Sequence, residues 1–240
     1  MEGIPLSGPN RVGAAESREA TDSLLAGLRA EGWGLRSWGR FAVATTARSL
    51  EQAGAHPRAV VEVSALHAAI SVVAGPGRRR WVATSWVMAV THLGMLGQRR
   101  SIGAASAVTV ARANLPAVTG NWPWLGVAAI CSDKADGVLA RRAGPTQFGH
   151  YADSLADASF WAWFAGRHET DRRLLATAAL SWVAPVAAVT VASFARGAMV
   201  EARQSAWVRP AAAMQAILAL RALRAGRASH PLAVSTGRRP

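Results

Sequence analysis

The feature that most constrains this chain is a run of carboxylates at helical spacing, from Asp133 to Asp157. Four of the six aspartates in the 240 residues lie in this stretch. Residues three or four apart share one face of a helix. The stretch reads D-x2-D-G-x2-A-R, seven further residues, then G-x3-D-x3-D, so each half predicts a helix with acidic and small residues on one face. The fixed positions are Asp133, Asp136, Gly137, Ala140, Arg141, Gly149, Asp153 and Asp157.

Gly144 and Pro145 separate the two halves of this pattern. Proline lacks a backbone N–H and its ring clashes with the preceding turn, so we expect the first helix to end near Arg142. The second helix then folds back as a hairpin. If the two acidic faces meet, up to four carboxylates converge, and the glycines at 137 and 149 let a bulky ligand approach the backbone closely.

Clustered carboxylates repel one another, and hard divalent cations such as Mg²⁺ or Mn²⁺ offset that repulsion through oxygen ligands. Two such ions about 3.5–4 Å apart would suit phosphate chemistry. Arg141 adds a guanidinium whose fork matches phosphate oxygens. Zinc is not expected, because the single Cys131 and the scattered histidines form no thiolate or imidazole cluster. The alternative is a solvated acidic helix face, which the apolar, tryptophan-rich surroundings disfavour.

The pattern resembles the signature of the CDP-alcohol phosphatidyltransferase family, integral membrane enzymes of phospholipid synthesis. All eight fixed positions are filled, and the seven-residue gap after Arg141 is at the short end of the family's range. The specific resemblance covers residues 133–157. A weaker resemblance extends over about residues 101–195, where residues 106–112 are similar to the Thr- and Arg-containing start of the family's first core helix.

The resemblance implies a transferase that moves a phosphatidyl group from a CDP-alcohol, commonly CDP-diacylglycerol, to an acceptor hydroxyl and releases CMP. The acceptor would be a small alcohol or a phosphorylated polyol. Two Mg²⁺ or Mn²⁺ ions are implied, and a homodimer is possible. The alternative is a catalytically inactive membrane scaffold, or a relative that only binds a CDP-alcohol.

The resemblance also assigns roles to the residues of the pattern. It implies metal ligands at Asp133, Asp136, Asp153 and Asp157, and Asp157 would also act as the general base. Nucleotide-binding positions are implied at Gly137, Ala140, Arg141 and Gly149, where the small residues give room and the arginine holds the diphosphate. Outside the pattern, Arg112 and the arginines of residues 196–209 could recognise a phosphorylated acceptor or anchor the chain at the membrane surface.

Composition favours an all-α, polytopic membrane bundle over a soluble domain. Hydrophobic residues make up 51% of the chain, and the mean hydropathy is +0.15. These values and the apolar runs predict about six transmembrane helices. The net charge of +13 indicates an anionic membrane surface as partner, and no nucleic-acid-binding motif is present. The resemblance implies an integral cell-membrane protein whose active site faces the cytoplasm, and the arginines of residues 98–100, 141–149 and 196–209 agree with the positive-inside rule.

We expect four parts along the chain. Residues 1–56 form a juxtamembrane segment, disordered to about residue 16 and then helical with a cap at Ser17. The helical part is either an amphipathic helix on the inner membrane face or a soluble helical cap. An apolar hairpin at 57–97 ends in a helix over 81–97. The family core spans 98–225, and a disordered basic tail spans 226–240. Within the core the predicted helices are 102–118, 125–142, 148–164 with an aromatic interfacial belt at its end, the uncharged span 174–194, and 210–220.

Overall fold

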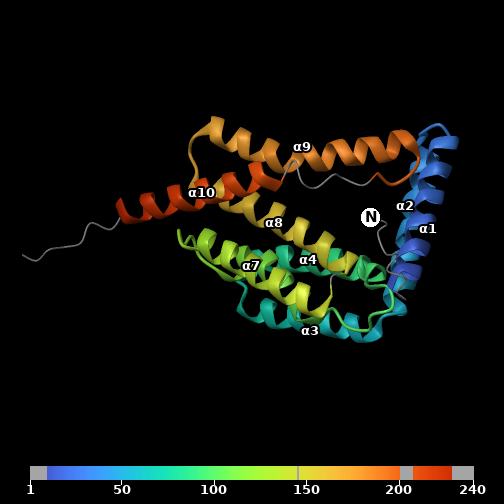
Figure 1. The fold of residues 1–240 in the computed structure, drawn as a ribbon, viewed down its shortest axis with the longest axis horizontal. Helices are drawn as coiled ribbons and strands as arrows, with labels where there is room; N and C mark the ends of the chain where they lie inside the picture. Colours follow the sequence, from blue (N-terminus) through green and yellow to red (C-terminus); the bar gives the residue numbers. More distant parts are fainter. Residues whose placement is uncertain (1–9, 145, 201–207, 229–240) are drawn as a thin grey trace, which may run out of the picture.

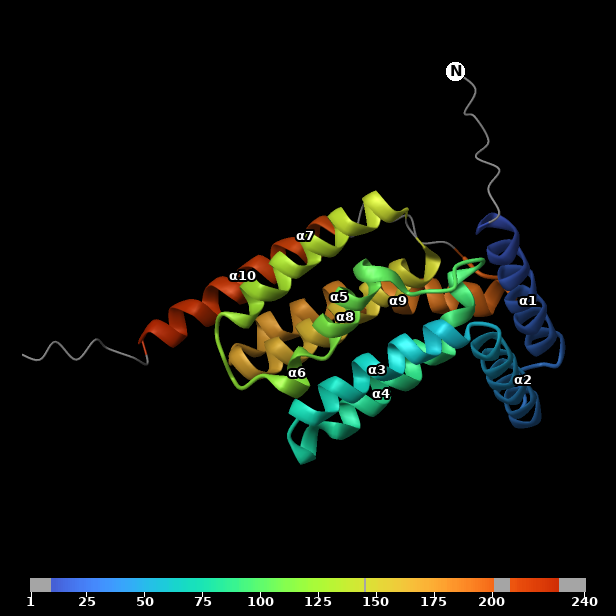
Figure 2. The same ribbon diagram turned by 90° about the horizontal axis from the view of Figure 1, so that it is seen from below.

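The computed structural model describes residues 10–144, 146–200 and 208–228, and these form helices and no strand, which confirms the all-α prediction (Figure 1). Most of the long helices lie side by side, whereas α1 and α2 lie across one end of the bundle (Figure 2). The helices are α1 (Asn10–Ala30), α2 (Leu35–Gly54), α3 (Pro57–Val73), α4 (Arg79–Thr91), α5 (Gly103–Ala113), α6 (Leu115–Val118), α7 (Leu125–Ala143), α8 (Gln147–His168), α9 (Arg172–Arg196) and α10 (Val208–Ala228), with 3₁₀ turns η1 (Pro76–Arg78) and η2 (Leu93–Leu96).

The short helix α5 lies at the centre of the fold. It packs against both α7 and α8, which contact each other much less, so the predicted acidic hairpin is held together through a third helix. Glu62 of α3 fixes the start of α5, because its Oε2 accepts hydrogen bonds from Ser101 Oγ (2.7 Å) and from the Ile102 backbone N–H (3.0 Å). This carboxylate stabilises the otherwise unsatisfied N-terminal turn of α5.

The predicted single helix over 102–118 is wrong, because the chain breaks at Asn114 between α5 and α6. Pro116 explains the break: it has no N–H to donate to the Arg112 carbonyl, and its ring crowds that turn. Asn114 is fully buried and donates through Nδ2 to Ser85 Oγ of α4 at 2.9 Å. Ser85 also contacts His67 Nε2 of α3 at 3.0 Å. The break therefore places a polar tie between α5 and the α3–α4 hairpin.

The predicted helix over 81–97 is correct only in part. The α-helix α4 ends at Thr91, and the chain continues as the tighter turn η2. Gly97, at the end of that turn, has a φ of 60°, a backbone conformation that other L-residues rarely adopt. Residues 92–97 thus form a compact connection to α5 rather than the last turns of a membrane span.

The largest core cluster lies where α7, α8, α9 and α10 meet. Phe160, Trp161 and Phe164 of α8 are almost completely buried there. The predicted interfacial belt at this end of α8 is therefore wrong, because these rings pack against α9 and α10 instead of facing the membrane surface. Gly126 permits the close approach of α7 and α10, since a Cβ added to it would lie 2.9 Å from Ala219 Cβ.

Helix α9 is the one described helix that is long and apolar enough to cross a membrane. It is 25 residues long, continuous through Pro185, and little of it is buried inside the bundle. Large apolar side chains such as Leu180, Val183 and Val191 are exposed along it. This surface suits lipid, and the six-span bundle remains a prediction.

The N-terminal segment is more helical than predicted. Helix α1 begins at Asn10, so the expected disorder to residue 16 and the cap at Ser17 are wrong, and residues 1–9 lie outside the described part. Gly32 and Trp33, both with positive φ, turn the chain into α2. Helix α1 is tied to the end of α9, because Asp22 Oδ1 accepts from the Met199 N–H at 2.6 Å. The predicted tail also starts too early, since α10 continues to Ala228; residues 229–240 are not described.

A buried carboxylate joins the α8–α9 connection to α10 and gives a testable pH dependence. Arg221 donates to both oxygens of Glu169, at 2.5 and 2.9 Å, and these hydrogen bonds hold the pKa of Glu169 below its usual value. Because the folded pKa is the lower one, the pair stabilises the fold above the unfolded pKa of about 4.3, and the stabilisation is lost as the pH falls through the folded pKa.

We expect Glu169→Gln to lower the melting temperature in detergent at pH 7, and the deficit relative to the unaltered protein to shrink toward zero below about pH 4. Thermal unfolding of both proteins between pH 3 and pH 8 measures this. A deficit that stays constant over that range would show that the charge of Glu169 does not contribute.

Candidate functional site

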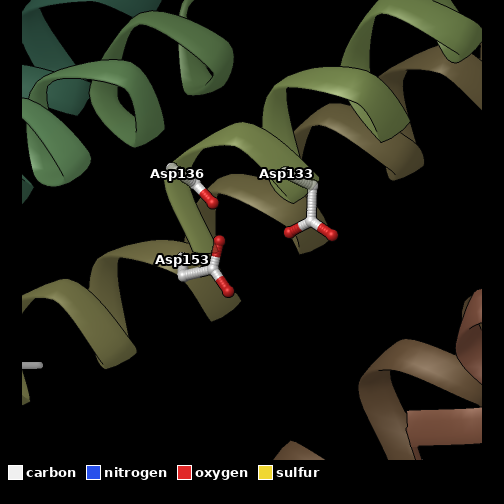
Figure 3. A group of neighbouring side chains, drawn as sticks. All are labelled: Asp133, Asp136 and Asp153. Carbon is white, nitrogen blue, oxygen red and sulfur yellow. The ribbon is translucent and has the colours of Figure 1, made fainter. Parts of the chain in front are cut away.

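Helices α7 and α8 bring three of the predicted aspartates together. One carboxylate oxygen each from Asp133, Asp136 and Asp153 can be chosen so that all three lie within 4.8 Å of one another. Figure 3 shows Asp136 and Asp153 pointing toward each other from the two helices, with Asp133 beside them one turn back on α7. The convergence expected from the spacing is thus present for these three aspartates.

The guanidinium of Arg112, from α5, lies among these carboxylates. Its Nη1 donates to Asp136 Oδ2 at 2.8 Å, and its Nη2 donates to Asp153 Oδ1 and lies 3.6 Å from Asp133 Oδ1. Thr109, one turn earlier on α5, donates to the same Asp136 oxygen at 2.8 Å. Two residues of α5 therefore fix the orientation of Asp136, which is itself buried.

Asp157 is the fourth carboxylate that contacts Arg112, and it lies beside Nε rather than beside the Nη1 and Nη2 groups that the other three contact. Its Oδ1 lies 3.1 Å from Arg112 Nε, yet neither atom has a hydrogen-bond partner and both are buried. Its Oδ2 accepts a hydrogen bond from Gln215 of α10 at 3.2 Å. Asp157 is thus in contact with the guanidinium without belonging to the tight group of three carboxylates. The two unsatisfied atoms are unusual for a folded interior, where buried polar groups are normally paired.

A pocket opens beside this cluster between α5, α7 and α8. Small side chains dominate its lining, which also includes Asp136 and Asp153; among the small lining residues are Gly103, Ala105, Ser106, Gly137, Ala140 and Gly149. Arg99 lies at its edge and donates from Nη2 to the carbonyls of Ala143 and Gly144, at 2.7 and 2.9 Å. This arginine caps the end of α7, where the unpaired carbonyls carry partial negative charge.

The predicted nucleotide-binding positions take different places in the structure. Gly137, Ala140 and Gly149 all line the pocket. Arg141 is exposed, and its guanidinium lies beside Gly137, since a Cβ on that glycine would be 3.4 Å from Arg141 Nη1. The arrangement leaves Arg141 at the rim, where its fork could meet a phosphate.

The donor set fits a hard divalent cation. Three carboxylates offer oxygen atoms close enough to share one ion, and carboxylate oxygens are the ligands that Mg²⁺ and Mn²⁺ prefer. A fully buried guanidinium already lies among these carboxylates, so the acidic cluster already contains one positive charge. One guanidinium cannot balance four carboxylates, which leaves room in the charge balance for further cations.

Two residues that contact the acidic cluster, Arg112 and Gln215, were not predicted to lie there. Arg112 was expected to contact an acceptor or the membrane surface, and the structure instead places it within the acidic cluster. Gln215 lies 58 positions after Asp157, and no local pattern connects them. A signal for α5 was present: Thr109 and Arg112 lie three apart on one helix face, and an arginine in an apolar helix needs anionic partners.

One comparison with known proteins identifies a domain. The CDP-alcohol phosphatidyltransferase family model matches residues 122–237, from the connection before α7 to beyond α10. The matched range contains all four clustered aspartates and excludes α5, so Arg112 is supplied from outside it. No curated protein and no solved structure gives a significant match to the chain.

Proposed function

We propose that the chain, whose residues 122–237 match the CDP-alcohol phosphatidyltransferase family model, transfers a phosphatidyl group from CDP-diacylglycerol to an acceptor hydroxyl. The observation that carries the proposal is the group of three aspartates converging beside a pocket lined by glycine and alanine. A nucleotide diphosphate needs this combination of cation ligands and unobstructed backbone.

The proposed reaction replaces the phosphoanhydride bond of the CDP-alcohol by a phosphoester bond to the acceptor. The acceptor oxygen forms a bond to the phosphorus that carries the lipid, and the bond from that phosphorus to the CMP oxygen breaks. CMP leaves with the electron pair, and the acceptor proton passes to a carboxylate. We assign this proton to Asp157, whose Oδ1 has no hydrogen-bond donor in the structure.

The other residues bind and orient in this proposal. Asp133, Asp136 and Asp153, with Asp157, would hold the divalent cations, which supply charge neutralisation at the diphosphate when bound. Thr109 keeps Asp136 oriented through its hydrogen bond. Gly137, Ala140 and Gly149 line the pocket and leave space for the nucleotide. Arg141, whose guanidinium lies beside Gly137, would meet the diphosphate. Positioning and charge neutralisation carry most of the rate in phosphoryl transfer.

Membrane placement follows the same proposal. Helix α9 provides one candidate span, and we propose that the long helices packed beside it also lie in the bilayer, with the extra hairpin at 57–97 next to the core at 98–225. The pocket then opens toward the cytoplasm. The α1–α2 pair, which lies across one end of the bundle, would rest on the membrane surface (Figure 1).

The experiment that tests the function is CMP release by the detergent-solubilised protein from CDP-diacylglycerol. Mg²⁺ or Mn²⁺ is present, and inositol phosphate, glycerol phosphate, serine and a second lipid are offered as acceptors. Release that depends on one acceptor supports the proposal and names the product. Folded protein that binds CDP-diacylglycerol but releases no CMP with any acceptor would favour the alternative of a binding protein.

We expect chelation to stop this reaction. EDTA should lower CMP release about 100-fold or more, because the four carboxylates would lose the cations that let a diphosphate approach them. Excess Mg²⁺ or Mn²⁺ should restore the rate. EDTA saturated with Mg²⁺ beforehand is the control and should have no effect. An unchanged rate in free EDTA would exclude a metal-dependent mechanism.

A further inference from the structure

We propose that Arg112 is the resident cation of the acidic site and that its guanidinium competes with divalent cations for the same carboxylates. This inference rests on the proposed metal site but concerns a residue outside the matched family domain. It goes beyond the transfer reaction, since it states what occupies and organises the site before a metal ion binds.

The contacts of the guanidinium support competition. The three carboxylates that can share one cation are Asp133, Asp136 and Asp153, and the Nη1 and Nη2 groups of Arg112 lie within 3.6 Å of an oxygen on each of them. A cation bound by the same three groups would share these carboxylates with the guanidinium, and the two positive charges would repel each other at short range. The guanidinium and the cation therefore compete for the negative charge of the same three groups.

Burial strengthens this competition. The Arg112 side chain has no exposed surface, whereas the side chains of Asp133 and Asp153 are 44% and 41% exposed. The arginine is thus enclosed by the protein, whereas these two carboxylates are partly exposed, and Asp153 also lines the pocket. A charge removed from water interacts strongly with its neighbours. The guanidinium consequently lowers the affinity of the site for any added cation.

The same arginine holds the site together without metal. Four carboxylates from α7 and α8 repel each other, and among the described residues Arg112 is the cation that contacts all four. Its Nε and the facing Asp157 oxygen form no hydrogen bond, so the guanidinium does not satisfy the whole cluster. The four carboxylates therefore outnumber the single cation that contacts them, and the cluster is still deficient in positive charge.

The test is Mn²⁺ binding, measured from the free Mn²⁺ signal in electron paramagnetic resonance. It compares unaltered protein, Arg112→Met and Arg112→Lys in detergent without substrate. We expect Arg112→Met to bind Mn²⁺ about tenfold more tightly or better, because a buried positive charge in contact with the ligands has been removed. Arg112→Lys, which keeps the charge but loses the fork, should show a smaller gain.

The matched control is Arg221→Met, which removes an arginine–carboxylate pair that contains none of the four clustered aspartates and should leave Mn²⁺ affinity unchanged. Equal or weaker binding by Arg112→Met would overturn the proposal, because the arginine would then preorganise the ligands and not compete with the ion. Absence of Mn²⁺ binding in every protein would also overturn it, and CMP release would still report separately on the proposed function.

Loss of folding is also informative. If Arg112→Met folds only when Mn²⁺ is present, the ion has replaced the guanidinium, as the proposal expects. If it folds under neither condition, Arg112→Lys decides: tighter Mn²⁺ binding than in the unaltered protein supports competition, and equal or weaker binding overturns it.

Discussion

Asp153→Asn should lower CMP release about 1,000-fold or more while the protein remains folded in the membrane fraction. The side chain keeps its size, but the carboxylate that faces both the pocket and Arg112 becomes neutral. A neutral amide is a weaker ligand for a hard divalent cation, and several kcal/mol of charge stabilisation would be lost from the transition state.

The matched control is Glu51→Gln, the same loss of charge at an exposed position of α2 that lies outside the pocket lining. It should leave CMP release unchanged. Thermal unfolding of both variants verifies that they are folded. Normal turnover by Asp153→Asn would remove this residue from the proposed set of metal ligands.

Gly137→Leu should lower CMP release about 100-fold by filling the pocket. Gly137 lies on the pocket wall one position after Asp136, and a Cβ there meets only Arg141 Nη1, at 3.4 Å. The helix therefore has space for the new side chain, and leucine has a higher helix propensity than glycine. The leucine side chain would occupy pocket space that we propose for the nucleotide and would displace the substrate. A displacement of about 1 Å at the reacting atoms costs on the order of 100-fold in rate.

Gly166→Leu is the matched control, because Gly166 lies in α8, is exposed, and has nothing within 4 Å of an added Cβ. We expect Gly137→Leu to keep or raise the melting temperature and Gly166→Leu to keep the rate. Full activity in Gly137→Leu would place the nucleotide somewhere other than this pocket.

The sequence predicted those features that depend on local spacing. Helices α7 and α8 lie close to the predicted 125–142 and 148–164, because Gly144 and Pro145 interrupt an otherwise periodic pattern. The convergence of Asp133, Asp136 and Asp153 follows from the same periodicity. The nucleotide-binding role of Gly137, Ala140 and Gly149 was predicted from the family resemblance, because the spacing alone does not identify the ligand.

The features that the sequence did not predict depend on tertiary packing. Arg112 enters the cluster because α5 packs between α7 and α8, which the spacing within one helix does not indicate. The aromatic residues of α8 looked suited to a membrane interface, yet Phe160 and Trp161 pack in the core because α9 and α10 cover that face. The break at Asn114 was overlooked, although Pro116 provided a local signal for it.

The central claim is that this chain moves a phosphate-linked lipid group from a CDP-alcohol to a hydroxyl. The most direct measurement quantifies both products of one reaction, CMP and the new phosphodiester, with CDP-diacylglycerol as donor and the preferred acceptor present. The account predicts equal amounts of the two products, formed only when acceptor, divalent metal ion and Asp153 are all present. CMP formed without a matching phosphodiester would indicate hydrolysis, and neither product from folded, metal-loaded protein would contradict the claim.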